Sequence, residues 1–333
     1  CQRVRSSMSG DMTLNTGKPP QGGEHPCWVL LGPTASGKTE LSLLLARRFP
    51  LEIVSVDSMQ VYRGMDIGTA KPDRAALGEV PHHMIDVVEP EEDFSVARFC
   101  RMAADAIEGI RARGVRPLLV CGTPLYLKAL LWGLFEGPGA DPSIRQRLRQ
   151  QAACYGPGRL HGILAQVDPI AADRIDPNDL KRIERALEVY ELTGQPISAR
   201  QAQFGGPPQI GHVAVGLRLP RPVLYERIER RVDRMMEAGL LEEVRRLRAR
   251  LGPQARQAVG YGELVAHLEG RCSLQQAVES IKRNTRRLAK HQLAWFRHFP
   301  RVCWIDVTAG LEESGDKCAE ELVKPCTFGG FGL

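Results

Sequence analysis

The segment GPTASGKT, residues 32–39, decides the fold of this chain. It follows the apolar run at residues 28–32, which is typical of a buried strand, and precedes a helix predicted over residues 38–48. In the pattern G-x-x-x-x-G-K-[ST], glycines let successive backbone N–H groups converge on phosphate oxygens at the positive end of a helix dipole. The segment therefore predicts a loop that binds a diphosphate or a triphosphate.

Every residue of this loop is a candidate diphosphate contact: Gly32, Pro33, Thr34, Ala35, Ser36, Gly37, Lys38 and Thr39. The Lys38 ammonium would neutralise a terminal phosphate, and the Thr39 hydroxyl would ligate Mg²⁺, the expected cofactor. Most loops of this kind serve kinases or nucleotide hydrolysis, so the loop taken alone favours ATP or GTP. It does not show which bond is broken.

Strand-like and helical patterns alternate around the loop. Strands are expected at residues 52–57, 116–122, 213–219 and 301–306, and helices at residues 95–113, 222–250 and 273–299. The alternation predicts an α/β fold, a parallel sheet of the P-loop NTPase type with helices on both faces.

The middle of the chain breaks this alternation. Residues 136–207 have helical periodicity without a convincing strand, which predicts an inserted all-helical domain. The catalytic core is then expected at residues 27–135 and 208–308. Residues 1–26 are expected to be a disordered lead-in without the apolar stretch of a secretory signal, and residues 309–333 a weakly patterned tail.

Composition restricts the class of protein. The 333 residues are 43% apolar and 25% charged, and no apolar run approaches the roughly 18 residues that span a bilayer, so we expect no membrane segment. The nine cysteines include no C-x-x-C pair, which favours reduced thiols in the cytoplasm and no structural zinc. The net charge of +6, with arginine-rich stretches late in the chain, suggests a polyanionic partner such as nucleic acid.

A carboxylate ends the second strand. Asp57 begins the segment DSMQVYRGMDIGTAKP, residues 57–72. The carboxyl end of a strand lies in the crevice where open α/β sheets bind their ligands, so Asp57 can reach a group held by the loop. The position of Asp57 alone is compatible with two roles: accepting a proton or helping to hold Mg²⁺.

Several segments together resemble the tRNA dimethylallyltransferases, also called tRNA isopentenyltransferases. They are GPTASGKT, DSMQVYRGMDIGTAKP, PHHMIDVVEPEEDFSVARF (81–99), CGTPLYLKALLWGL (121–134), RIERALEVYELTG (182–194), MEAGLLEEV (236–244), AVGYGEL (258–264) and TRRLAKHQLAWFR (285–297). Because they occur in the family's order over nearly the whole chain, we expect dimethylallyl diphosphate as prenyl donor and the anticodon stem-loop of tRNA as acceptor. The resemblance also implies a monomer.

The resemblance assigns roles to individual residues. It implies that Asp57 is the general base for the adenine N6, that Thr123 lies at the reaction centre, and that Arg231 binds the diphosphate. The residues that it places against tRNA are Asp57, Ser58, Met59, Gln60, Thr123, Lys181, Arg182, Arg185, Arg256, Tyr261, Lys282, Arg286 and Lys290. For Tyr261, packing and stacking are equally expected. Basic side chains of this set would chiefly contact phosphates.

Three positions depart from the family pattern. Pro124 replaces a glycine and removes a backbone donor beside Thr123, which casts doubt on the local geometry. Gly262 and His291 replace basic residues, so two tRNA contacts are expected to be weaker. No zinc-finger pattern surrounds Cys318 and Cys326, so the chain resembles the bacterial form.

Other functions remain open at this point. A small-molecule or nucleoside kinase would use the same loop for ATP, with Asp57 activating a hydroxyl. A prenyltransferase acting on free adenine nucleotides would lack the extended insertion that this chain has at residues 136–207. A third alternative is a nucleotide-dependent RNA-binding switch, which only the phosphate-binding loop and the net positive charge support.

Overall fold

A six-stranded parallel sheet forms the centre of the protein. The computed structural model describes residues 26–134, 137–200 and 206–324. The strand order is β3-β2-β4-β1-β5-β6, and every pair is parallel. The strands are β1 (Cys27–Leu31), β2 (Leu51–Val56), β3 (His82–His83), β4 (Arg116–Cys121), β5 (His212–Arg218) and β6 (Val302–Asp306). The predicted parallel α/β fold is confirmed.

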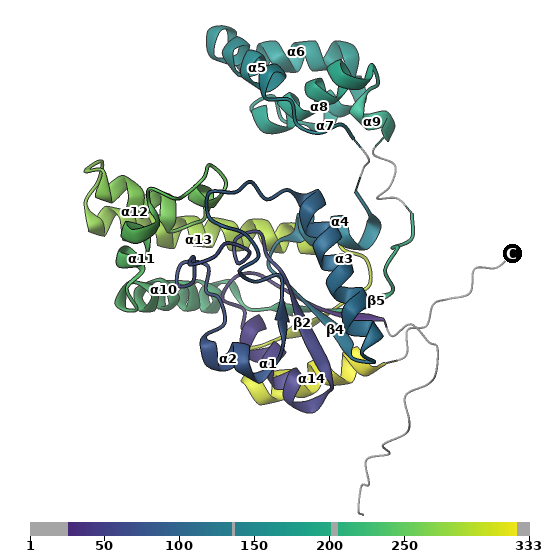
Figure 1. Cartoon of the computed structure of the whole chain (residues 1–333), viewed down its shortest axis with the longest axis vertical. Coiled ribbons are helices and arrows are strands. Elements are labelled where there is room, and N and C mark those ends of the chain that lie inside the picture. The colour runs from purple at the N-terminus through teal and green to yellow at the C-terminus, as the bar shows by residue number, and fades with distance from the viewer. Residues whose placement is uncertain (1–25, 135–136, 201–205, 325–333) are drawn as a thin grey trace, which may run out of the picture.

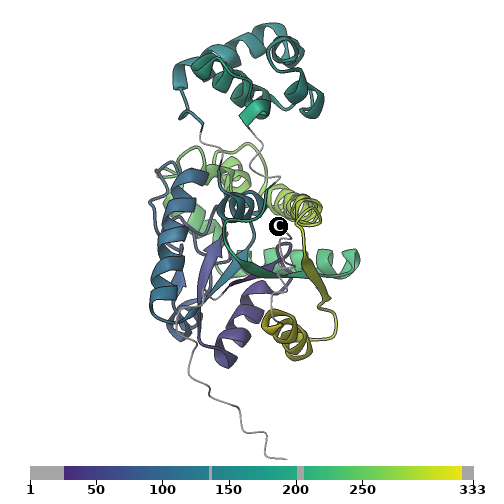
Figure 2. The same cartoon turned by 90° about the vertical axis from the view of Figure 1, so that its right-hand side faces the viewer.

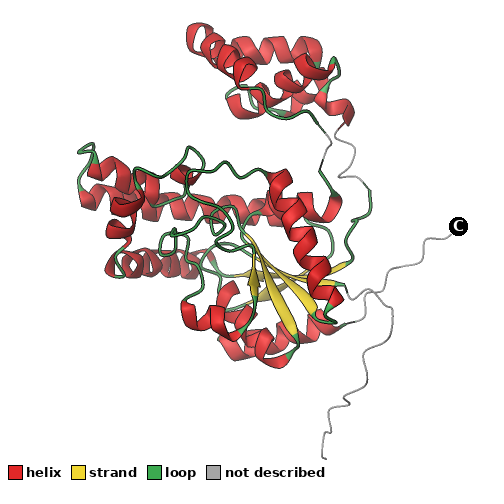
Figure 3. Cartoon of the chain, viewed as in Figure 1, coloured by secondary structure: helices red, strands yellow, loops and turns green. Residues whose placement is uncertain are grey.

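The central strands are buried on both faces, as their continuous apolar runs require. Alternate residues of β1 enter two different apolar clusters: Val29 and Leu31 pack with one face, Trp28 and Leu30 with the other. Helices cover both faces, as Figure 3 shows around the yellow strands. The clusters place α3, α4 and α13 on the first face and α1 and α14 on the second.

The helices agree with the longer predicted segments and add short ones. They are α1 (Lys38–Arg48), α2 (Arg74–Glu79), α3 (Val96–Ala112), α4 (Pro124–Trp132), α5 (Pro142–Tyr155), α6 (Pro157–Val167), α7 (Pro169–Arg174), α8 (Leu180–Thr193), α9 (Ile197–Arg200), α10 (Arg221–Glu237), α11 (Leu240–Leu247), α12 (Tyr261–Leu268), α13 (Leu274–Phe296) and α14 (Leu311–Val323). The sequence patterns did not predict β3, α2, α4 and α12. These elements are too short for a periodic signal.

The weakly patterned tail contains a packed helix. In α14, Ser314, Cys318 and Leu322 recur every four residues and are buried against the second face of the sheet. The small Gly315 lets α14 approach α1 closely, because a Cβ there would lie 2.0 Å from a Leu44 methyl group. The two helices lie side by side in Figure 1. The weak sequence pattern of residues 309–333 did not indicate this helix. Residues 325–333 and 1–25 lie outside the described residues.

Helices α5 to α9 form the region expected to be an inserted domain. In two perpendicular views they stand at one end of the molecule, away from the sheet (Figures 1 and 2). They bury an apolar cluster of their own, which includes Leu148, Leu164 and Leu187. Aspartates cap three of these helices by accepting backbone N–H bonds at α5, α7 and α8.

A buried carboxylate joins two of the inserted helices. Glu188 of α8 is 0% exposed and accepts two hydrogen bonds from the Arg145 guanidinium of α5, at 2.8 and 2.9 Å. It also accepts from Arg185 at 2.7 Å and from the backbone N–H of Asp141 at 2.8 Å. Burial raises the pKa of Glu188, but these donors outweigh it and hold that pKa below its ordinary value.

We predict that Glu188→Gln destabilises the insertion by about 3 kcal/mol, because it leaves two partly buried guanidinium groups without their carboxylate. Since the native pKa of Glu188 is lowered, its contribution is present above about pH 4.5 and is lost as the pH falls through the native pKa. Thermal unfolding followed by circular dichroism should show that the difference in stability between the variant and the wild type becomes smaller as the pH is lowered. Glu191→Gln is the control, because Glu191 lies on the same helix as Glu188 and its ion pair with Arg147 of α5 is more exposed. Equal losses of stability for both variants would contradict the prediction.

Candidate active site

The phosphate-binding loop connects the central strand β1 to α1. Gly37 adopts a φ of 95°, a left-handed conformation that favours glycine, and turns the chain into the helix. The Lys38 ammonium donates to the carbonyl oxygens of Gly32 and Pro33, at 2.9 and 2.8 Å. The side-chain hydroxyl of Ser36 is buried and has no hydrogen-bond partner among the described residues. The loop thus has the geometry of an anion-binding site, in which the Ser36 hydroxyl can still bond to a ligand.

Two cations with lowered pKa values lie near this loop. Burial and repulsion from Arg231 lower the pKa of Lys38 to about 8. Burial also lowers the pKa of Arg231, although the charges of Glu40 and Asp57 oppose the shift. In the described part of the chain neither cation has an ion-pair partner within 4.0 Å. Buried cations that repel each other are stabilised by a shared anion, so the pair marks a site for a polyanionic ligand.

Asp57 and Thr123 lie at the carboxyl ends of the neighbouring strands β2 and β4. The Asp57 Oδ1 atom accepts the backbone N–H groups of Met59 at 2.8 Å and Gln60 at 3.2 Å. The Thr123 hydroxyl accepts the Ser58 N–H at 3.0 Å and donates to the Ser58 hydroxyl at 3.3 Å. Because β4 also pairs with β1, these groups and the loop meet at one edge of the sheet.

The turn between β4 and α4 tolerates the unusual proline. Thr123 is the N-cap of α4 and Pro124 is its first residue, where a helix needs no backbone donor. Pro124 therefore leaves the geometry of Thr123 intact. Gly122 leaves room for the carboxylate: a Cβ there would lie 2.7 Å from the Asp57 Oδ2 atom, so a larger residue would make one of the two groups shift.

Sequence reasoning missed the importance of Gln292 in α13. Its side chain hydrogen-bonds both to the loop at Thr34 and to the turn at Gly122. Thr34 and Gln292 are 258 residues apart in the chain, so no local pattern could have revealed the contact.

The cations predicted for tRNA on α13 are arranged along one helix. Lys282 pairs with Asp233 at 2.7 Å, and Arg286 with Glu229 at 2.6 Å, so both bind carboxylates of α10 in this structure. Lys290 is exposed. Of the predicted base contacts beside Asp57, Gln60 donates to the carbonyl oxygens of Thr69 and Ala70.

The remaining predicted cations differ in their exposure and in their partners. Lys181 and Arg182 at the start of α8 are exposed, and Lys181 donates to Gln257 of the core at 3.2 Å. Arg256 is partly exposed and pairs with Glu269. Arg185 instead binds the buried Glu188 and the carbonyl oxygen of Pro138. Arg185 is partly buried and is already bonded within the insertion, while its predicted contact with tRNA stays a prediction.

Tyr261 also has a packing role rather than an RNA-stacking role. It is 0% exposed, and its hydroxyl donates to Glu243 at 2.6 Å. The same Glu243 carboxylate accepts the backbone N–H groups of Asp66, Ile67 and Gly68. Burial raises the pKa of Tyr261, so the phenol stays protonated as a donor. A ring enclosed in this way offers no face to a base, so of the two roles expected for Tyr261 the structure favours packing.

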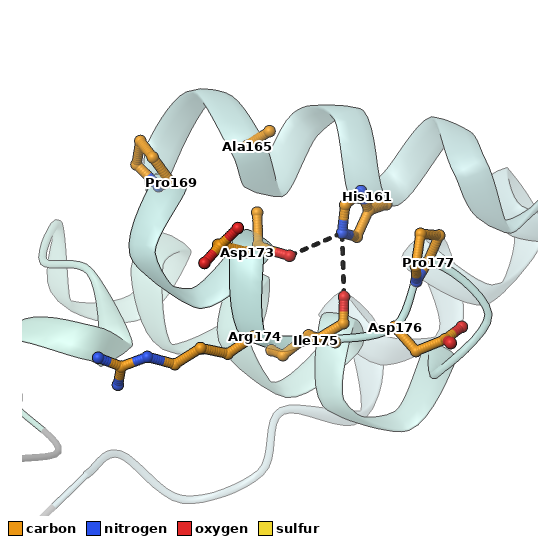
Figure 4. A pocket seen from close by; sticks show the side chains of 9 residues that line it. His161, Ala165, Pro169, Asp173, Arg174, Ile175, Asp176 and Pro177 are labelled. Atoms are coloured by element: carbon orange, nitrogen blue, oxygen red, sulfur yellow. Dashed lines mark hydrogen bonds between the residues drawn. The ribbon is translucent and has the colours of Figure 1, made fainter.

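A hollow in the insertion lies apart from the groups described above. A cavity of about 680 Å³ opens on the insertion between α6 and α7, and Figure 4 shows His161, Asp173 and Asp176 around it. The His161 Nε2–H group donates to the carbonyl oxygens of Ala172 and Ile175, so its donor is already used. The cavity contains no residue of the loop or of the Asp57 site, so it is separate from the candidate active site.

The described residues also limit other classes of site. They contain no group of three or more histidine, cysteine or acidic side chains placed to hold a metal ion by themselves. None of the described helices is both long enough and apolar enough to cross a bilayer.

We predict that Tyr261→Phe lowers the free energy of unfolding by about 1–3 kcal/mol, because Glu243 loses a buried donor. The affinity for tRNA should stay within about twofold of wild type. Chemical denaturation and filter binding measure the two quantities. A large loss of tRNA affinity in a variant of unchanged stability would restore the stacking role.

Comparisons with known proteins agree on one family. A model of the IPP transferase family matches residues 60–299, and one described as isopentenyl transferase matches residues 26–86. The tRNA dimethylallyltransferase of Symbiobacterium thermophilum is 50% identical over 302 residues, which are 90% of this chain and 94% of that protein. The corresponding enzyme of Geobacter sulfurreducens is 47% identical, over 85% of this chain and 93% of that one.

Solved structures show the same relationship. The tRNA isopentenylpyrophosphate transferase of Bacillus halodurans is 42% identical, with a TM-score of 0.66 over 89% of this chain and 96% of that one. A eukaryotic dimethylallyltransferase, described as acting on tRNA, is 27% identical, with a TM-score of 0.70 over 90% of this chain and 81% of that one. On this similarity of sequence and fold, the chain belongs to the IPP transferase family, whose members named here are tRNA-modifying prenyltransferases.

Proposed function

We propose that this protein transfers the dimethylallyl group of dimethylallyl diphosphate to N6 of the adenine on the 3′ side of a tRNA anticodon, releasing pyrophosphate. The observation that carries the proposal is the meeting of the Asp57 carboxylate and the Thr123 hydroxyl with a phosphate-binding loop at one edge of the sheet. Curated relatives that match nearly the full chain are tRNA dimethylallyltransferases, which disfavours the kinase alternative.

Asp57 is suited to accept the proton that the adenine amine loses. Its Oδ1 atom is held by two backbone N–H groups, which leaves the Oδ2 atom, beside Gly122, to accept a proton. In the reaction a bond forms between N6 and C1 of the prenyl group while the bond from C1 to the diphosphate oxygen breaks. Removing the N6 proton keeps the nitrogen lone pair available, which accelerates the attack.

The loop and its two cations would hold the departing diphosphate. Lys38 and Arg231 supply positive charge in a poorly solvated place, where it stabilises the growing charge on the leaving oxygen most effectively. Thr39 lies in the first turn of α1, and the Ser36 hydroxyl has no partner in the described part of the protein. Both fit a Mg²⁺ ion that is bound mainly through the diphosphate. When bound, Mg²⁺ would neutralise charge on the leaving group.

The basic side chains outside the site suit an RNA partner. Lys181, Arg182 and Lys290 are exposed on two different helices and would contact phosphates. A loop of tRNA suits the chemistry, because its bases can be turned out of their stack at low cost to reach Asp57. The dimethylallyltransferase described as acting on tRNA supports this class of acceptor.

We predict that Asp57→Asn lowers kcat for prenyl transfer by about 10²-fold to 10⁴-fold, because the amide can accept the two N–H groups but cannot take up a proton. The assay combines Mg²⁺, an unmodified tRNA transcript with adenine after the anticodon, and labelled dimethylallyl diphosphate. Asp105→Asn, at an exposed position of α3, is the control.

A parallel reaction with γ-labelled ATP separates the alternative functions. Prenyl label should enter tRNA with the wild type and the control, and ATP label should not be transferred. Transfer or release of the ATP label without prenyl transfer would replace the prenyltransferase proposal with a kinase or a nucleotide switch.

We predict that Gly122→Ala lowers kcat about tenfold to a hundredfold, because the new Cβ displaces the Asp57 carboxylate from a position 2.7 Å away. Gly78→Ala in α2 is the control, since a Cβ there has no atom within 4 Å. Initial rates at saturating substrates and thermal unfolding are measured for both variants. A fully active Gly122→Ala protein would show that the position of Asp57 is not critical.

A further inference from the structure

Gln292 of α13 connects the two halves of the site through one side chain. Its Oε1 atom accepts the backbone N–H of Thr34 in the phosphate-binding loop at 2.8 Å. Its Nε2 atom donates to the carbonyl oxygen of Gly122 at 2.6 Å. The residue is only 6% exposed, so water does not compete for these bonds.

Both partners of Gln292 adjoin groups that take part in the chemistry. Thr34 belongs to the loop that would hold the leaving group. Gly122 packs against the Asp57 carboxylate and immediately precedes Thr123. The N–H groups of Gly122 and Thr123 in turn donate to the carbonyl oxygen of Val56, which precedes Asp57. The amide therefore ties the diphosphate site to the proton acceptor.

The helix that carries Gln292 is anchored in the core. Ile281, Ala289 and Phe296 of α13 are buried, so the amide is held on a rigid element. The same helix carries the candidate tRNA contacts Lys282, Arg286 and Lys290. Helix α13 thus connects the predicted RNA contacts with the phosphate-binding loop.

We propose that Gln292 is a positioning residue, which fixes the distance between the departing diphosphate and the Asp57–Thr123 pair. This inference rests on the proposed function. The contacts require an amide, because one end must accept a hydrogen bond and the other must donate one. Methionine cannot donate and accepts only weakly, an ionised glutamate can only accept, and asparagine is one methylene too short to reach both partners. A change at Gln292 should therefore slow the reaction more than it weakens either substrate's binding.

The first test compares Gln292→Met and Gln292→Asn with Gln275→Met, a control at an exposed position of the same helix. For the Gln292 variants kcat should fall about tenfold to a hundredfold, while the Kd values for pyrophosphate and for tRNA stay within about threefold of wild type. Steady-state kinetics, calorimetric titration and thermal unfolding give the three readouts. If both Gln292 variants keep wild-type kcat, or if they lose only affinity, Gln292 is not a positioning residue.

The second test uses Gln292→Glu and the pH profile of kcat. An ionised glutamate repels the Gly122 carbonyl oxygen, whereas the protonated acid can donate to it and still accept from Thr34. A carboxyl group buried beside a carbonyl oxygen has a raised pKa, so the ratio of variant to wild-type kcat should rise as the pH is lowered. The other titratable groups of the site, namely Asp57, Lys38, Arg231 and Cys121, are the same in the wild type and in the variant. Their titration therefore affects both kcat values of the ratio. A ratio that is constant with pH would overturn the proposal.

The wild-type reaction separates this inference from the proposed function. If wild-type protein transfers no prenyl group, the proposed function fails before any variant is considered. If wild type is active and the variants match it, only the role of Gln292 fails.

Discussion

The pairing of β2, β4 and β1 as adjacent parallel strands is the constraint on which the site depends. Parallel strands end at the same edge of a sheet, so the groups that follow them are brought together whatever their distance in sequence. Asp57, Thr123 and the phosphate-binding loop follow these three strands. Burial on both faces fixes the register, because a shift of one residue would turn every apolar side chain to the wrong face.

The positively charged side chains of the protein differ in whether a carboxylate of the protein pairs with them. Most arginines of the insertion form ion pairs within it, as Arg145, Arg149 and Arg185 do with two glutamates of α8. Lys38 of the site differs, since its bonds within the described ranges go to two carbonyl oxygens and its pKa is lowered. A cation that lacks a carboxylate partner is a better indicator of an anionic ligand than the net charge of the chain.

Local patterns predicted much of the fold and the main chemical groups. The G-x-x-x-x-G-K-T motif, the apolar strands and the acid after β2 all act through neighbours in sequence, so their structural meaning could be inferred from the sequence. Gln292 and Tyr261 could not be interpreted in this way, because their roles depend on contacts with distant segments. The bond of Arg185 to Glu188 was not foreseen, because its other partner, the carbonyl oxygen of Pro138, lies 47 residues away in the chain. Helix α14 was missed because its stripe of Ser314, Cys318 and Leu322 contains only one strongly apolar residue.

Pro124 affects the unfolded chain as well as the active site. It occupies the first position of α4, where its fixed φ and missing N–H cause no strain. A glycine there would have many more conformations to lose on folding, so proline favours the folded state by roughly 0.4–1 kcal/mol through the entropy of the disordered chain. The residue that departs from the family pattern thereby preorganises the turn that presents Thr123.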